Sequence, residues 1–187
     1  MRGMLVKRTF DLTVAALALG LFAPLLALLA LAVRVRLGKP VLFAQARPGL
    51  HGAPFRLLKF RTMTDGRDAS GQLLPDQVRL TPFGAFLRRT SLDELPELIN
   101  VLKGEMSLVG PRPPIPSEVD QYDLWHRRRL SMKPGMTCLW QTARNRNGVR
   151  FEDWMTLDLQ YIDNWSLKLD FVILLKTVGV VVSGEGR

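Results

Sequence analysis

Two adjacent carboxylates, Asp93 and Glu94, are the residues of this sequence best suited to chemistry. They lie just downstream of Arg88 and Arg89, where we expect a helix to begin. A helix start and nearby arginines stabilise phosphate charge, and carboxylate oxygens are suitable ligands for Mg²⁺. A carboxylate is ionised at pH 7 without help from a base, so Asp93 could attack phosphorus and form an aspartyl phosphate. The pattern therefore indicates phosphoryl chemistry.

The same segment also has a purely structural interpretation. Ser91 and Glu94 have the spacing of a capping box, and Pro96 is tolerated in a first helical turn. Taken alone, the segment favours this structural interpretation. The loop 110–114, Gly-Pro-Arg-Pro-Pro, changes the balance because its limited backbone freedom would hold Arg112 in place before a substrate arrives.

Several other chemistries find no support in the sequence. It contains no GxxxxGK[ST] phosphate loop, no GxGxxG, no HExxH and no paired CxxC. Its single cysteine, Cys138, cannot form an intramolecular disulfide. The two histidines, His51 and His126, are too few and too scattered to form a zinc site with it.

Charge and hydropathy are strongly segregated along the chain. Of 187 residues, 47% are apolar, yet the chain carries a formal net charge of +9. A basic balance suits nucleic acid, an anionic membrane surface or a phosphate-rich substrate, and charge alone does not separate them. A basic, membrane-tethered binding module is therefore one alternative to an enzyme, supported by the run 127–129 of three arginines.

An apolar segment without charges, residues 12–33, predicts a membrane anchor. At ~1.5 Å per residue, its 22 residues could cross a ~30 Å hydrocarbon core as one helix. However, basic residues flank both ends, which favours both ends on the cytoplasmic face, and Pro24 lies near the middle. We therefore predict a re-entrant helix-break-helix over residues 1–38, in preference to a single span.

The remainder, residues 39–187, is predicted to form one cytoplasmic, membrane-associated catalytic domain. Strands over 41–45 and 55–63 predict a small β-hairpin, with Lys59 and Arg61 on the same face of the second strand. Helices are predicted at 82–89, from 91 to 102, at 117–130 and at 151–161, and the apolar segment 171–182 is expected to be core or an amphipathic surface helix.

Several segments resemble the bacterial sugar transferase family, the small monotopic polyprenyl-phosphate phosphoglycosyl transferases. Residues 59–63 (KFRTM), 90–101 (TSLDELPELINV) and 104–113 (GEMSLVGPRP) carry the similarity. Residues 133–137, 140–141 and 157–162 match its C-terminal motifs. The resemblance covers nearly the whole chain in order, which makes it highly specific.

This resemblance implies a mainly α fold with a small β-hairpin. A re-entrant membrane helix and amphipathic interfacial helices would surround a compact catalytic core. It also implies a location on the cytoplasmic face of the bacterial inner membrane, in contact with phospholipid and without nucleic acid. A homodimer is possible, and the sequence leaves the oligomeric state open.

The resemblance implies a two-step reaction. Asp93 attacks the β-phosphate of a UDP-sugar and releases UMP, and polyprenyl (undecaprenyl) phosphate then takes the phosphosugar. The product would start an exopolysaccharide, capsule, O-antigen or glycoprotein glycan. Asp93 and Glu94 would also bind Mg²⁺. The implied substrate-binding residues are Lys59, Arg61, Arg88, Arg112, Pro113, Gln141 and Arg146.

Two departures from the family pattern affect these expectations. Ala23-Pro24 stands where members often have Ser-Pro. Residues 141–147 read QTARNRN in place of Gln-Val-x-Gly-Arg-Asn, so the nucleotide-contacting arginine is Arg144 or Arg146, with Arg146 favoured. A membrane glycosyltransferase that releases UDP remains a second enzyme alternative, and the sequence does not identify the sugar.

Overall fold

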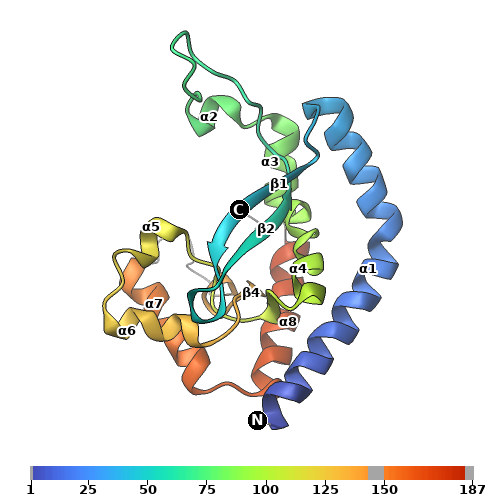
Figure 1. The fold of residues 1–187 in the computed structure, drawn as a ribbon. Coiled ribbons are helices and arrows are strands. Elements are labelled where there is room, and N and C mark those ends of the chain that lie inside the picture. Colours follow the sequence, from blue (N-terminus) through green and yellow to red (C-terminus); the bar gives the residue numbers. More distant parts are fainter. Residues whose placement is uncertain (1, 143–149, 184–187) are drawn as a thin grey trace.

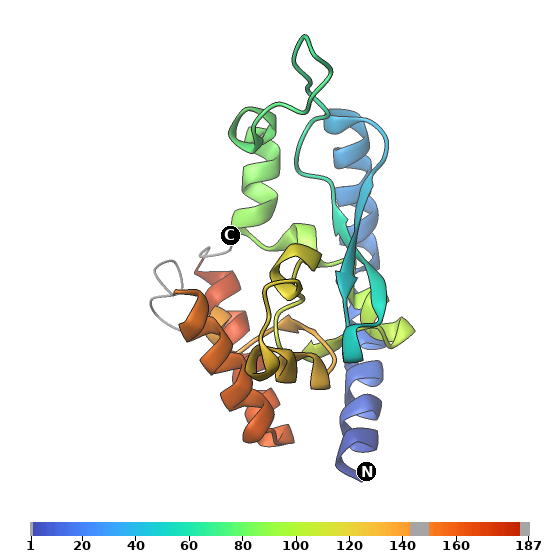
Figure 2. The same ribbon diagram turned by 60° about the vertical axis from the view of Figure 1, so that its left-hand side comes forward.

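The computed structural model describes residues 2–142 and 150–183, which form a mainly helical protein with two small sheets (Figures 1 and 2). The α-helices are α1 Arg2–Leu37, α2 Asp76–Arg79, α3 Pro82–Arg89, α4 Glu97–Lys103, α5 Pro116–Val119, α6 Leu124–Arg127, α7 Phe151–Asp163 and α8 Leu167–Val182. The 3-10 helices are η1 Leu50–Gly52, η2 Leu92–Glu94, η3 Arg128–Ser131 and η4 Trp140–Thr142. The strands are β1 Leu42–Pro48, β2 Pro54–Phe60, β3 Ser107–Val109 and β4 Gly135–Thr137.

The N-terminal helix α1 runs without interruption through Pro24, contrary to the predicted break at this residue. Its axis instead changes direction about midway (Figure 1), as expected where a proline removes a backbone donor. Its most apolar stretch has a mean hydropathy of 2.6, and only 11% of that stretch is buried inside the protein. By length and composition, α1 is able to cross a membrane.

The first half of α1 nevertheless belongs to the protein core. Lys7 donates a 2.6 Å hydrogen bond to Asp170 on α8, and both side chains are buried. Asp11 accepts a 2.7 Å hydrogen bond from Ser107 on β3, and Ala15 is fully buried in the main hydrophobic cluster. Helix α1 is therefore joined to the rest of the fold by buried polar contacts as well as apolar ones.

The second half of α1 packs beside the hairpin and α3. Leu29 and Val33 form a separate hydrophobic cluster with Phe60, at the end of β2, and Leu87 on α3. The predicted hairpin is confirmed as an antiparallel β1–β2 pair, with Leu42 opposite Phe60 and Pro48 opposite Pro54. The strands lie at 42–48 and 54–60, so the predicted second strand extended too far.

Helix predictions after the hairpin were correct in some places and wrong in others. The predicted helix 82–89 coincides with α3, and the helix predicted at 151–161 is α7. The segment 91–102 divides into the 3-10 turn η2 and helix α4. The segment 117–130 was predicted as one helix but forms α5, α6 and η3, because Asp123 leaves the helical path and caps α6 through the His126 amide at 2.8 Å.

The C-terminal helix α8 is partly a core helix and partly an amphipathic surface helix, the two alternatives predicted for residues 171–182. Ser166 caps its start by accepting a 3.2 Å hydrogen bond from the Leu169 amide. Ile173 lies fully buried in the core, whereas Phe171 and Leu175 on the other side of the helix are more than half exposed. The helix thus contributes to the core and leaves an apolar face uncovered.

Candidate active site

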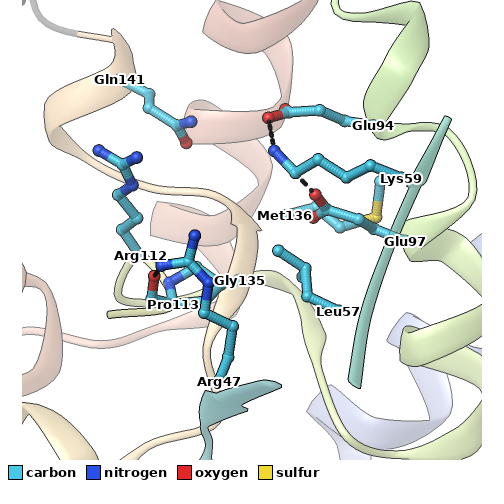
Figure 3. A pocket seen from close by; sticks show the side chains of 10 residues that line it. All are labelled: Arg47, Leu57, Lys59, Glu94, Glu97, Arg112, Pro113, Gly135, Met136 and Gln141. Atoms are coloured by element: carbon cyan, nitrogen blue, oxygen red, sulfur yellow. Dashed lines mark hydrogen bonds and ion pairs between the residues drawn. The ribbon is translucent and has the colours of Figure 1, made fainter. Parts of the chain in front are cut away.

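A solvent-open pocket lies between the hairpin, the η2–α4 segment and the loop after β3 (Figure 3). In Figure 3, Arg47 and Arg112 stand on one side of this pocket, and Glu94, Glu97 and Lys59 stand on the other. The remaining lining residues are Leu57, Pro113, Gly135, Met136 and Gln141. A basic wall therefore faces an acidic one, and the structure brings together residues from four distant parts of the chain.

Lys59 is the central cation of the acidic wall. Its Nζ lies 2.5 Å from Glu94 Oε1 and 3.3 Å from Glu97 Oε1. Burial disfavours the charged form of Lys59, but the two carboxylates outweigh it, and its pKa is raised. Glu97 is almost fully buried, and burial together with the neighbouring Glu94 raises the pKa of Glu97 in spite of Lys59. The wall has more carboxyl groups than cations, so it suits an additional positive charge.

Asp93 lies in the same turn as Glu94 but is only 6% exposed and does not line the pocket. Burial raises the pKa of Asp93 to about 6, and the charge of Glu94 adds to the shift. Lys59 and Arg88 act in the opposite direction and keep the pKa from rising further. At neutral pH this carboxylate is ionised in a poorly solvated position, a state suited to a nucleophile.

The capping box that the sequence suggested does not form. Ser91 has a left-handed backbone, with φ of 55°, and its side chain makes no capping hydrogen bond to η2. Glu94 pairs with Lys59 instead of turning back toward Ser91. The Ser91–Glu94 segment is therefore not explained by a helix cap, and consecutive positions of the 3-10 turn place Asp93 and Glu94 in different surroundings.

Close packing of α3 places Arg88 beside the segment that follows β2. Arg88 Nε donates a 3.1 Å hydrogen bond to the hydroxyl of Thr62. Gly84 allows this approach, since a Cβ at that position would lie 1.8 Å from the Thr62 carbonyl oxygen. Arg88 is half-buried and does not line the pocket, but it lies close enough to Asp93 for its charge to lower the pKa of that carboxyl.

Arg112 is held by contacts to both its guanidinium and its backbone. The guanidinium carbon lies 5.6 Å from the ring centre of Trp140 and 5.2 Å from that of Trp154. Its carbonyl accepts a 2.8 Å hydrogen bond from Arg129, which is itself buried and paired with Asp158 at 2.6 Å. The predicted rigidity of this loop thus arises from aromatic stacking and a buried ion pair as well as from its prolines.

The loop also starts from a tightly packed pair of strands. β3 and β4 are parallel, a pairing that the sequence did not predict. A Cβ on Gly135 would lie 2.1 Å from the backbone nitrogen of Gly110, so glycine is required where the two strands meet. Pro113 and Gln141, both predicted to bind substrate, line the pocket beside Arg112.

The structure does not bring Arg61 to the pocket. Its guanidinium donates hydrogen bonds to the carbonyls of Leu37, Lys39 and Met63 and pairs with Asp65 at 2.6 Å. It therefore connects the end of α1 to the chain after β2. The two candidates for the nucleotide-contacting arginine, Arg144 and Arg146, lie outside the described residues.

Sequence reasoning missed Arg47 and Glu97 as pocket residues. Arg47 was assigned to the turn after the first strand, whereas β1 continues to Pro48 and places Arg47 opposite Phe55. Glu97 was counted as part of a helix start. Glu94 and Glu97 are three residues apart, a spacing that places two side chains on the same face of a helical segment. This spacing could have predicted that both line the pocket.

The acidic wall has the chemistry to take part in Mg²⁺ binding. Among the residues that the structure describes, no group of three or more acidic, histidine or cysteine side chains forms a ready-made metal cage. Mg²⁺ usually keeps several waters and is bound by one or two carboxylates together with substrate phosphates. Glu94, which lines the pocket, fits that mode of binding, whereas Asp93 lies in the same turn but does not line the pocket.

Comparison with known proteins defines the class of this protein. The family model described as bacterial sugar transferase matches residues 2–184, and the chain belongs to this family. The resemblance seen in the sequence is therefore confirmed, and the protein is a transferase enzyme.

Three relatives illustrate the similarity. The sugar transferase EpsL of Bacillus subtilis is 49% identical over 98% of this chain and 90% of its own length. The exopolysaccharide production protein ExoY of Rhizobium meliloti is 39% identical over 98% of this chain and 88% of its own. A UDP-glucose:undecaprenyl-phosphate glucose-1-phosphate transferase of Caulobacter vibrioides is 45% identical over 92% of this chain and 68% of its own.

Proposed function

We propose that this enzyme transfers a sugar 1-phosphate from a UDP-sugar to polyprenyl phosphate, releasing UMP. The observation that carries the proposal is the 45% identity, over 92% of this chain, to the Caulobacter protein named for this reaction with UDP-glucose. The pocket supports it, since arginine and carboxylate walls face one another in the manner expected for a metal-bound diphosphate (Figure 3). The name of ExoY supports a role in exopolysaccharide synthesis.

Asp93 is the proposed nucleophile. A carboxylate oxygen attacks the β-phosphorus of the UDP-sugar, the bond from that phosphorus to the bridging oxygen breaks, and UMP leaves. An oxygen of polyprenyl phosphate then attacks the same phosphorus, releases Asp93 and yields the polyprenyl-diphosphate sugar. The raised pKa of Asp93, about 6, still leaves most of it ionised at pH 7 and makes it more basic than an exposed aspartate.

The other site residues serve binding and charge balance. When bound, Mg²⁺ would neutralise phosphate charge and reduce its repulsion of the nucleophile. Glu94, with Asp93, would hold that ion, and Lys59 would then be available to the phosphates. Arg112, fixed over Trp140 and Trp154, would bind a phosphate oxygen without rearrangement.

The membrane arrangement belongs to the same proposal. Residues 1–38 insert into the cytoplasmic leaflet of the inner membrane as a re-entrant, bent helix, and residues 39–187 lie on the cytoplasmic face. The bend of α1 and the basic residues at both of its ends support this topology (Figure 1). The exposed apolar face of α8 would contact the bilayer surface. A cysteine introduced before Lys7 that is labelled only from the periplasm would contradict it.

The nucleotide product tests the reaction directly. The purified enzyme in detergent with Mg²⁺ is given a panel of UDP-sugars, starting with UDP-glucose, with and without undecaprenyl phosphate. We expect UMP with one donor, and an amount close to one equivalent of enzyme when the acceptor is omitted. Release of UDP would identify a glycosyltransferase, and the absence of any nucleotide, with strong salt-dependent nucleic-acid binding, would identify a binding module.

A further inference from the structure

We propose that Arg47 is a further substrate-binding residue, forming with Arg112 a two-guanidinium site for one phosphate group. The inference rests on the proposed function and adds to it a residue that neither the motifs nor the resemblance singled out. Both guanidinium groups lie on the same wall of the pocket, opposite Glu94 and Lys59 (Figure 3).

The hydrogen bonds of Arg47 leave donors free for a ligand. Its Nη1 donates to the Pro113 carbonyl at 3.3 Å, and its Nη2 donates to Gln45 Oε1 at 2.8 Å. The buried Nε has no acceptor among the residues that the structure describes. A guanidinium carries five N–H donors, and a buried donor without a partner is costly. Nη1 and Nη2 each carry a second N–H with no acceptor among the residues that the structure describes, and an oxyanion in the pocket would accept hydrogen bonds from these two groups.

The two positive charges of Arg47 and Arg112 on this wall also favour binding of an anion. Burial and the neighbouring charge of Arg112 lower the pKa of Arg47, and the more distant Glu118 and Glu97 only partly offset them. The carboxylate of Glu94, across the pocket, is already paired with Lys59. A phosphate placed between the two arginines would relieve their mutual repulsion and accept bonds from both.

Arg47 is held firmly enough to act without rearrangement. It lies within β1, opposite Phe55, which is buried in the core. Its contact with the Pro113 carbonyl joins it to the same loop that carries Arg112. The two guanidinium groups are therefore fixed relative to one another before the substrate enters, which lowers the entropic cost of binding.

The phosphate bound here comes from the UDP-sugar or from the polyprenyl phosphate, and steady-state kinetics distinguishes them. Arg47→Gln is compared with the wild-type enzyme in detergent, with each substrate varied in turn and UMP release as the readout. We expect the KM of one of the two substrates to rise about 10- to 100-fold, the loss of a charge-assisted hydrogen bond. A rise for the UDP-sugar assigns the donor phosphate, and a rise for the lipid assigns the acceptor phosphate.

Arg56→Gln is the matched control, because Arg56 lies on the neighbouring strand, is exposed and is absent from the pocket lining. We expect its two KM values to equal those of the wild type. If Arg47→Gln does not fold, Arg47→Lys is measured in its place. Lysine keeps the positive charge but lacks the paired N–H donors of the guanidinium, so we expect a threefold or greater rise in one KM. Both KM values unchanged, or a fall in kcat alone, would overturn the role of Arg47. An inactive wild-type enzyme would instead overturn the proposed function.

Discussion

Asp93 and Glu94 are neighbours in one 3-10 turn, yet only Glu94 lines the pocket, while Asp93 is 6% exposed and lies behind it. The left-handed backbone of Ser91 precedes this turn, and successive residues of a 3-10 turn point in different directions. One of them is thus neutralised by Lys59 in the open pocket, and the other is kept basic by burial. Two residues of similar chemistry acquire different roles through their surroundings.

The pH dependence of the reaction follows from the pKa of Asp93, about 6. As the proposed nucleophile, Asp93 must be ionised, so we expect kcat/KM for the UDP-sugar to be level above pH 7 and to fall below pH 6, approaching tenfold per pH unit. Measuring UMP release between pH 5 and 8 checks this, because kcat/KM reports the pKa values of the free enzyme. A profile that stays flat down to pH 5 would show that Asp93 has an ordinary pKa.

Replacing Asp93 by asparagine is expected to abolish turnover and to stabilise the fold. The rise in pKa from 3.8 to about 6 disfavours the ionised carboxylate in the folded state, by about 3 kcal/mol at pH 7 if the whole shift is realised. We expect a stabilisation of about 1–3 kcal/mol, seen as a higher Tm in detergent.

The sign of this effect depends on pH in a defined way. The penalty is complete above about pH 7, where folded Asp93 is ionised, decreases as the pH falls through 6, and disappears below the unfolded pKa of 3.8, where Asp93 is protonated in both states. The gain in Tm of Asp93→Asn should therefore shrink between pH 7.5 and pH 4. Asp120→Asn, at an exposed position, should show no such trend. A lower Tm for Asp93→Asn at pH 7.5 would contradict the prediction.

Substituting Gly84 tests the packing that positions Arg88. The Cβ of Gly84→Ala would meet the Thr62 carbonyl oxygen at 1.8 Å, so α3 must move away and loosen the hydrogen bond from Arg88 to Thr62. We expect a loss of about 1–3 kcal/mol of stability together with a clear loss of turnover. Gly179→Ala on α8, where no atom lies within 4 Å of the new Cβ, is the control and should preserve both.

The buried pair of Arg129 and Asp158 supports the loop of Arg112. Arg129→Met leaves Asp158 buried without its partner and is expected to cost about 3–5 kcal/mol. The neighbouring Arg128 offers a matched control: its pair with Asp163 is about half exposed, and Arg128→Met should cost less than about 1 kcal/mol. Denaturation in detergent measures both. Equal losses in the two variants would show that the buried pair has no special role.

Elements of the fold could be predicted from the sequence where the pattern that specifies them lies within a few neighbouring residues. The hairpin was predicted from alternating apolar residues and turn residues, and α3 from the helical spacing of its apolar residues, and all of these signals act over a few positions. The parallel β3–β4 pair joins two three-residue strands far apart in sequence, and so short a strand has no readable periodicity. Arg61 was assigned to the site by its motif, but the carbonyls that bind it belong to the end of α1 and could not be inferred from strand alternation.

The candidate site shows the same limit. Asp93, Glu94, Lys59 and Arg112 were identified by residue type and motif, and the structure places all of them at or beside one pocket. Arg47 was missed because its function depends on strand length and on the position of a loop 66 residues away.

The buried bond between Lys7 and Asp170 has a consequence for the synthesis of this protein. Lys7 precedes Asp170 by 163 residues, so it leaves the ribosome well before its partner is made. Tyr161, which also donates to Asp170, is made only slightly earlier. Lys7 therefore has no partner until α8 has been made, whereas the apolar middle of α1 is made long before. Premature termination anywhere before α8 would leave a fragment with an unpaired lysine, an exposed apolar helix and an incomplete core, a natural substrate for quality-control proteolysis.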